Sequence, residues 1–235
     1  MKNRRTYFSL ERKARFGSLR FSFIMALLLL PQTRNNLALN LPFEKLSRWQ
    51  QIAFAGALLE RMLPNYRMFS DSSQFGDYKL LRNQLDLIWQ WLDKNNQVKI
   101  NINAQLNKLE EQTPDPESFD SFGVLPALDV CMAMMSLLQL MQSNGTDKDH
   151  EDINSVSRLS HNSVSYYVEL LLIDEGATEI LPANIDEHPL AVWEKETQYE
   201  LFDFLKFAAE NKRSCQLAKD MVLSEGLSNL GIEIE

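Results

Sequence analysis

Residues 122–141 read FGVLPALDVCMAMMSLLQLM and form the most apolar segment of the chain. Asp129, Ser136 and Gln139 are the polar side chains that interrupt it. A helix that is apolar on every side is buried either in a protein core or in a membrane. Because Pro126 and Asp129 both fall in its first half, this segment makes a poor membrane span. We therefore expect it to be the buried centre of a soluble helical fold.

Seven further segments carry apolar residues at spacings of three and four, which is typical of amphipathic helices. We predict helices over residues 43–63, 65–74, 77–94, 149–174, 189–211 and 212–225, and one that begins at Asn101 or Asn103. Short connections between long helices favour antiparallel packing. The prediction is an all-α, single-domain antiparallel helical bundle of about seven to eight helices.

Prolines and capping residues mark the expected helix ends. Pro42 suits the first turn of the helix over residues 43–63, and Pro64 is expected to end it, because the residue before a proline disfavours the α conformation. Asp77 is the expected N-cap of the helix over residues 77–94. The stretch TPDPES at residues 113–118 is the best candidate for a boundary between two halves.

Charge divides the chain unevenly at residue 38. The net charge is −8, but residues 1–38 hold eight Lys or Arg and one Glu, which gives them +7 and leaves −15 for residues 39–235. Nucleic-acid binding requires a basic face that displaces counterions from phosphates. No such face is visible after residue 38, so we expect no nucleic-acid partner.

The N-terminal segment, residues 1–38, differs from the rest of the chain. A basic stretch runs to Arg20, and an apolar run, FSFIMALLLL at residues 21–30, ends at Pro31. This run is shorter than the roughly 20 residues of a membrane span. Three interpretations stay open: an extension or a start assigned too early, with Met25 as an alternative start; a basic arm that touches anionic lipid; or an export signal. Any membrane contact is expected through this segment alone, and residues 39–235 form the helical domain.

The sequence holds little recognisable chemistry. It has no phosphate-binding glycine loop, no nucleophile elbow, no zinc-protease motif and no Cys-x-x-Cys pair. A di-iron bundle needs two Glu-x-x-His pairs, and the nearest match is a single Asp147-x-x-His150. Cys131 and Cys215 lie in apolar helical patterns, which favours a reducing cytoplasm over a disulfide framework. We expect no metal and no cofactor, and the balance leans against an enzyme.

Asp129 is the most informative single residue, because a carboxylate in an apolar helix must be hydrogen-bonded, paired or neutral. We expect an ion pair or a hydrogen bond, with Arg61 or Arg48 as the cationic partner. The functional alternative is a small polar pocket that also contains Glu60, Tyr66 and Asp86.

Several short motifs resemble a known family. They are LSRWQQIAF at residues 46–54, ERMLPNY at 60–66, QL at 105–106 with KLE at 108–110, GV at 123–124 with PA at 126–127 and Asp129, and SN at 228–229 with GI at 231–232. Over about residues 40–235 the chain resembles the YjaG-like bacterial family, which is classed as a domain of unknown function. The resemblance implies an all-helical cytosolic protein and supplies no activity, cofactor or catalytic residue.

The expected function is a non-enzymatic binding or interaction module whose partner is another protein or a second copy of this chain. The alternative is a small-molecule binder or an enzyme that uses a carboxylate and arginine pocket around Asp129. A closed cavity lined by Asp129, Glu60 and Arg61 would favour this alternative. An exposed apolar surface would favour the interaction module.

Overall fold

The computed structural model describes residues 39–96, 98–143 and 147–234, with side chains from residue 151 onward in the last range. The N-terminal segment therefore lies outside the described residues, as do all three interpretations of it. Within the described part there are eight α-helices and two 3-10 helices and no β-strand, which confirms the all-α prediction. The elements are η1 (Phe43–Lys45), α3 (Arg48–Ser73), α4 (Tyr78–Leu92), α5 (Ile102–Glu110), η2 (Pro116–Ser118), α6 (Val124–Gln142), α7 (Asp147–Asp174), α8 (Pro182–Asp186), α9 (Pro189–Phe207) and α10 (Lys212–Val222).

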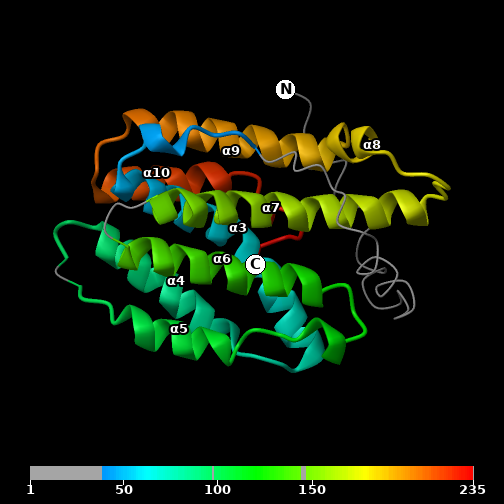
Figure 1. Ribbon diagram of the computed structural model, residues 1–235, viewed down its shortest axis with the longest axis horizontal. Coiled ribbons are helices and arrows are strands. Elements are labelled where there is room, and N and C mark those ends of the chain that lie inside the picture. The colour runs from blue at the N-terminus through cyan, green and yellow to red at the C-terminus, as the bar shows by residue number, and fades with distance from the viewer. Residues whose placement is uncertain (1–38, 97, 144–146, 235) are drawn as a thin grey trace.

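Helices α3 and α6 organise the bundle. Helix α6 packs mainly against α7 and α3, and α3 also contacts α4, α7, α9 and α10. Figure 1 shows α8 and α9 along one side of the molecule and α4 and α5 along the other, with α6 and α7 between them. Since α3 touches most of the other long helices, its side chains can reach partners on both sides of the bundle.

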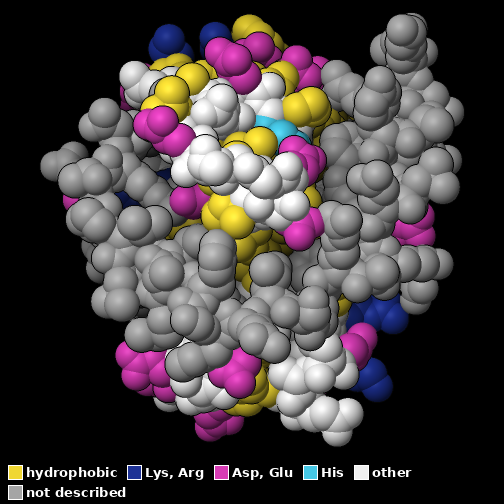
Figure 2. All heavy atoms as spheres, turned by 90° about the vertical axis from the view of Figure 1, so that its right-hand side faces the viewer, with side chains coloured by type: hydrophobic (Ala, Val, Ile, Leu, Met, Phe, Trp, Pro, Cys, Tyr) yellow, Lys and Arg dark blue, Asp and Glu magenta, His cyan; other side chains and the backbone are white. Residues whose placement is uncertain are grey.

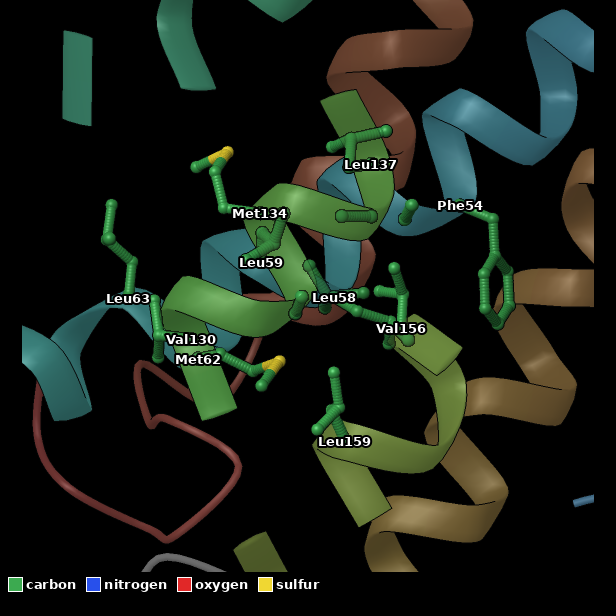
Figure 3. Packing of buried hydrophobic residues seen from close by; sticks show 14 of the residues in the cluster. Phe54, Leu58, Leu59, Met62, Leu63, Val130, Met134, Leu137, Val156 and Leu159 are labelled. Atoms are coloured by element: carbon green, nitrogen blue, oxygen red, sulfur yellow. The ribbon is translucent and has the colours of Figure 1, made fainter. Parts of the chain in front are cut away.

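Helix α6 is the buried centre that its composition predicts. In Figure 3, Val130, Met134 and Leu137 of α6 meet Leu58 and Met62 of α3. Fully burying each such side chain stabilises the fold by about 1.5–3 kcal/mol. Among the described helices, α6 is long and apolar enough to cross a membrane by length and composition, and 72% of that stretch is buried inside the protein. Its apolar surface is thus covered by neighbouring helices.

The prediction that Pro64 ends a helix is wrong. Helix α3 runs without interruption from Arg48 to Ser73 with Pro64 inside it, and replaces the two predicted helices. An internal proline lacks a donor and costs about 3 kcal/mol or more. The side chains on both sides of Pro64 are nevertheless buried, up to Leu63 before it and at Asn65 and Tyr66 after it. Tertiary packing of both halves therefore outweighs the local penalty.

Three helix starts show which capping signals were decisive. Helix α3 begins with a capping box formed by Ser47 and Gln50. Pro42, which was expected in the first turn of this helix, precedes the 3-10 helix η1. Asp77 caps α4 as predicted, and Asn101 caps α5, which settles the choice left open with Asn103. In each case a side-chain oxygen accepts a backbone N–H that would otherwise lack a partner.

The proline-rich break at residues 113–118 contains η2 and joins helices that share one core. Helices α3 and α4 precede it, and α6, α7, α9 and α10 follow it, yet α3 packs against all of them. The break therefore connects helices that pack against one another.

Candidate functional site

Asp129 lies on α6 and is bonded to α7. Its Oδ2 accepts a hydrogen bond of 2.6 Å from the hydroxyl of Ser163, and both side chains are buried. Burial raises the pKa of Asp129 to about 7, and the hydrogen bond from Ser163 opposes this shift. Of the two expected environments, the structure forms the hydrogen bond.

Arg61 does not pair with Asp129, which corrects that part of the prediction. Its Nη1 donates to Oε2 of Glu194 on α9 at 2.5 Å, and both side chains are 0% exposed. The indole ring of Trp193 covers the guanidinium, with its centroid 3.9 Å from Cζ. Burial lowers the pKa of Arg61, and the charge and hydrogen bond of Glu194 oppose this shift. The ion pair joins α3 to α9 across 133 positions of sequence, a separation over which spacing gives no information.

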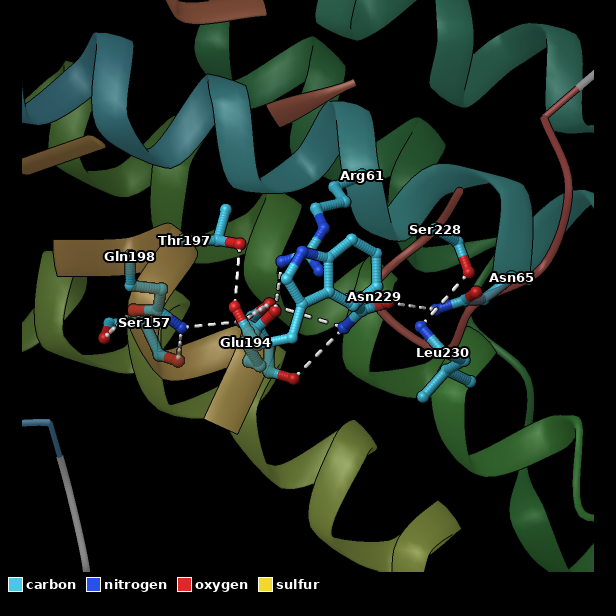
Figure 4. A network of polar contacts seen from close by, with 11 residues as sticks. Arg61, Asn65, Ser157, Glu194, Thr197, Gln198, Ser228, Asn229 and Leu230 are labelled. Carbon is cyan, nitrogen blue, oxygen red and sulfur yellow. Dashed lines mark hydrogen bonds and ion pairs between the residues drawn. The ribbon is translucent and has the colours of Figure 1, made fainter. Parts of the chain in front are cut away.

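The buried polar network around Glu194 extends into α7 (Figure 4). Oε1 of Glu194 accepts hydrogen bonds from the Ser160 hydroxyl at 2.6 Å and from Nε2 of Gln198 at 2.8 Å. Ser157 in turn donates to Oε1 of Gln198 at 2.6 Å. The carboxylate of Glu194 thus accepts hydrogen bonds from Arg61, Ser160 and Gln198. The network thereby fixes α3, α7 and α9 relative to one another.

Asn229 connects the C-terminal segment to this network. Its backbone N–H donates to the carbonyl of Arg61, and its side-chain Nδ2 donates to the carbonyl of Ser160 at 3.1 Å. Its Oδ1 accepts from Nδ2 of Asn65 at 2.8 Å. Asn229 is fully buried, so each of these bonds replaces one to water.

Glu60 and Asp86 come together through a residue that the sequence analysis did not single out. Arg82 binds both carboxylate oxygens of Glu60, at 2.5 and 2.9 Å, and Oδ1 of Asp86 at 2.7 Å. The indole N–H of Trp89 also donates to Glu60, and the ammonium of Lys219 lies 3.5 Å from it. Burial alone raises the pKa of Glu60, but Arg82, Lys219 and Trp89 together lower it below its ordinary value.

Arg48 and Tyr66 have separate structural partners. Nη2 of Arg48 donates to the carbonyls of Leu140 and Met141, at 3.1 and 2.7 Å, and so places a cation at the C-terminal end of α6. The hydroxyl of Tyr66 donates to the carbonyl of Gln112, and burial raises its pKa. The six residues of the predicted pocket thus lie in several environments, because each polar group is bonded where its own helix carries it.

A groove lies on the surface between the second half of α3, the start of α4 and the C-terminal segment. Its volume is about 440 Å³. The apolar part of its lining consists of Pro64, Met68, Ile232 and Ile234. Arg67, Asp71, Ser72, Tyr78 and Glu233 form the rest of the lining. We call this the α3–tail groove.

Charged side chains at the groove partly neutralise one another. Nε of Arg67 lies 3.8 Å from Oδ2 of Asp71, and its guanidinium lies 5.7 Å from the ring centroid of Tyr78. Asp71 and Glu233 are exposed. Figure 2, which shows one end of the molecule, displays acidic side chains with hydrophobic ones between them over the described atoms. The groove therefore combines an apolar lining with two exposed carboxylates, Asp71 and Glu233, and the guanidinium of Arg67.

The described residues offer little to a metal ion or a nucleophilic mechanism. Among them, no group of three or more His, Cys, Asp or Glu side chains is placed to hold a metal. Cys131 and Cys215 are buried and free, and burial raises the pKa of their thiols to about 12 and about 11. Both thiols are therefore protonated at neutral pH and poor nucleophiles.

Sequence reasoning missed Glu194, Gln198 and Asn229. Helix α9 did contain a signal for the first two, because Glu194 and Gln198 are four residues apart and continue to Leu201 and Leu205 along one helix face. Polar residues within an apolar stripe indicate buried hydrogen bonds. For Asn229 the periodicity of the helices gives no signal, since it follows the last helix.

The described residues form an all-helical protein. A model of the family described as "Protein of unknown function (DUF416)" matches residues 39–233, and the chain belongs to this family. This confirms the resemblance to the YjaG-like family, whose motifs begin at residue 46.

Relatives from bacteria match this chain over nearly their whole length. The chain is 34% identical over 197 residues to "Uncharacterized protein YjaG" of Escherichia coli (strain K12), which covers 83% of this chain and 95% of that protein. It is 33% identical over 192 residues to an uncharacterized protein of Haemophilus influenzae, covering 81% and 94%. The crystal structure of a DUF416 family protein from Shewanella baltica OS155 has a TM-score of 0.70 at 33% identity, and covers 81% of this chain and 97% of that chain.

Proposed function

We propose that this protein is a non-enzymatic interaction module that binds an apolar, basic segment of a partner protein in the α3–tail groove. The observation that carries the proposal is the groove itself, with an apolar lining and exposed acids at its rim. Its volume of about 440 Å³ suits a few aliphatic side chains and falls within the usual range of binding pockets.

Charge supports a basic partner. Residues 39–235 carry a net charge of −15, and Asp71 and Glu233 are exposed beside the apolar lining. Complementary charge raises the rate at which partners meet and suppresses binding of the wrong ones. Arg67 lies close to Asp71, which reduces its repulsion of a cationic partner.

The partner is a cytoplasmic protein or a second copy of this chain. Two free, buried cysteines support a reducing compartment. Residues 1–38 of a second copy combine a charge of +7 with an apolar run at residues 21–30, which is the chemistry that the groove requires. Self-association is therefore one outcome of the experiment below.

The alternative, a ligand or substrate pocket around Asp129, has less support from the contacts of these side chains. Arg61 binds Glu194, Glu60 binds Arg82, and Asp129 has Ser163 as its hydrogen-bond donor. Each of these three side chains therefore has a different partner from within the protein.

Photo-crosslinking in cells tests the proposal. Benzoylphenylalanine replaces Met68 in the groove or, as a matched control, Met132, which is 43% exposed on α6. We expect Met68 to crosslink a segment that carries Lys or Arg next to aliphatic residues, and Ile232→Asp to abolish that product. Equal products from Met68 and Met132, or an acidic segment at Met68, would contradict the proposal.

A further inference from the structure

Residues 226–234 form a short segment, here called the strap, that has two different faces. On one face, Asn229 and Leu230 are fully buried against the helical body. On the other, Ile232 and Ile234 line the α3–tail groove. The strap is therefore the wall that separates the groove from the buried network, and Figure 4 shows its residues beside Arg61.

The strap is bonded to itself. The N–H of Ser228 donates to the carbonyl of Ile232 at 2.8 Å, and the N–H of Ile234 donates to the carbonyl of Gly226 at 3.0 Å. The hydroxyl of Ser228 also accepts from the N–H of Leu230 at 3.1 Å. Because these bonds lie within the strap, they survive if it separates from the helices.

A glycine in a left-handed conformation begins the strap. Helix α10 ends at Val222, and Gly226 adopts a left-handed conformation with φ of 65°. Glycine enters and leaves this region without the steric penalty that other residues meet. Gly226 can therefore act as a hinge between α10 and the strap.

The body beneath the strap is incompletely hydrogen-bonded. Nε and Nη2 of Arg61 and Oδ1 of Asn65 are buried and have no hydrogen-bond partner among the described residues. Both residues are contacted by Asn229 of the strap. Buried polar groups without partners raise the free energy of the closed state. Water admitted by opening the strap would hydrate them, which lowers the free energy difference between the closed and open forms.

We propose that the strap opens as a unit about Gly226 while the helices stay folded, and that occupation of the α3–tail groove holds it closed. The second statement rests on the proposed function, and the first does not. A partner that contacts Ile232 and Ile234 binds the closed form alone, so it must shift the strap toward closure. By reciprocity, a variant that favours opening must bind the partner more weakly.

Hydrogen exchange of the full-length protein tests the opening. We expect the amide of Asn229, which is bonded to the carbonyl of Arg61, to exchange at least about tenfold faster than those of Val130 and Met134 in α6, with a weaker dependence on denaturant. Equal rates and equal denaturant dependence in the wild type would show that the strap opens only on global unfolding, and would overturn the proposal without any variant.

A pair of variants sharpens this test. Asn229→Ala removes the side-chain bonds between strap and body, and Asn83→Ala is the control, since Asn83 is exposed on α4. We expect Asn229→Ala to accelerate exchange of the amide at residue 229 and to leave Val130 and Met134 unchanged. Acceleration of all amides by the same factor would contradict a hinged strap.

The coupling is tested by the yield of the Met68 crosslink. In the Asn229→Ala background we expect this yield to fall several-fold, and in the Asn83→Ala background to stay constant. If the yield is unchanged although strap exchange is faster, the proposed coupling is wrong, but the proposed opening of the strap still stands. Absence of a Met68 crosslink in the wild type would remove the proposed function and the coupling together, while the exchange rates would still decide the opening.

Discussion

Glu60 and Arg61 are neighbours on α3 and belong to two very different charged regions. Arg61 forms a pair with Glu194 in which both side chains are 0% exposed. Glu60 belongs to a cluster at the edge of the bundle, where Arg82 is 25% and Lys219 24% exposed. Each region is covered by a tryptophan, Trp193 in the first and Trp89 in the second.

The comparison teaches that solvent access, more than the identity of the charges, decides what an ion pair does. A fully buried pair contributes little net stability, but removing one partner leaves an uncompensated charge. A pair at the surface is screened by water and salt. The Arg61 region should therefore respond strongly to single substitutions and weakly to salt, and the Glu60 region in the opposite way.

The largest expected effect is that of Glu194→Ala. Loss of this carboxylate leaves Arg61 buried and unpaired and should lower the free energy of unfolding by about 3–5 kcal/mol, as urea denaturation would measure. The double variant Arg61→Met/Glu194→Met removes both charges and should recover most of this loss. A double variant as unstable as the single one would show that packing, and not the unpaired charge, causes the effect.

Asp129 is a third buried charged group, and its hydrogen-bond donor is the neutral hydroxyl of Ser163. It therefore shows how a buried carboxylate behaves with a neutral donor in place of a cation. Its folded pKa of about 7 exceeds the ordinary value of 3.8, so the folded state binds a proton more tightly than the unfolded state. The contribution of Asp129 to stability must therefore fall as the pH rises from 4 to 7, by on the order of 3 kcal/mol.

Asp129→Asn should remove this pH dependence. Urea denaturation at pH 4.5 and pH 8 would show a smaller difference in the free energy of unfolding for Asp129→Asn than for the wild type. Asp71→Asn, at an exposed position on α3, is the matched control and should leave the wild-type difference intact. Identical pH profiles for all three proteins would contradict the raised pKa.

Glu60→Gln is expected to have an intermediate effect. It removes the charge that Arg82 and Lys219 face and should lower the free energy of unfolding by about 1–2 kcal/mol at neutral pH. Because the pKa of Glu60 is lowered, its contribution is present above about pH 4.5 and is lost as the pH falls through the folded pKa. The loss should shrink in 1 M salt, whereas the loss from Glu194→Ala should not. If salt changed the losses from Glu60→Gln and Glu194→Ala equally, solvent access would not explain the difference between the two regions.

Lys219→Ala should have the smallest effect. Its ammonium lies 3.5 Å from Glu60 and 4.5 Å from the ring centroid of Trp89, at a partly exposed position. We expect a loss of less than about 1 kcal/mol that disappears at high salt. Lys212→Ala is the control, since that side chain is 80% exposed and 4.0 Å from Asp93, and should leave the urea midpoint unchanged. Equal shifts from both would show that general charge, and not the cluster, is responsible.

Local patterns predicted much of the fold. The apolar run at residues 122–141 predicted the buried helix α6, and the caps at Asp77 and Asn101 placed two helix starts. These features depend on neighbours within a few residues. The end at Pro64 was mispredicted, because packing by distant helices overrides a local preference.

The candidate site was less accessible to sequence reasoning. The prediction identified Arg61, Glu60 and Asp129, which are buried, but it paired Arg61 with Asp129 and did not name Arg82 as the partner of Glu60. Pairing of Arg61 with Glu194, and of Glu60 with Arg82, depends on how α3, α4 and α9 are arranged in space. The groove combines α3 with residues 232–234, a combination that no single stretch of sequence contains.

Pro64 lies inside α3 and has no N–H to offer the carbonyl of Glu60, so the ladder of main-chain bonds is broken there. The ion-paired residues 60 and 61 sit on one side of this break, and the groove residues Arg67 and Met68 on the other. Helices bend most readily at such positions. A segment bound in the groove would therefore contact the part of α3 that follows Pro64, while the ion pairs of Glu60 and Arg61 hold the part that precedes it.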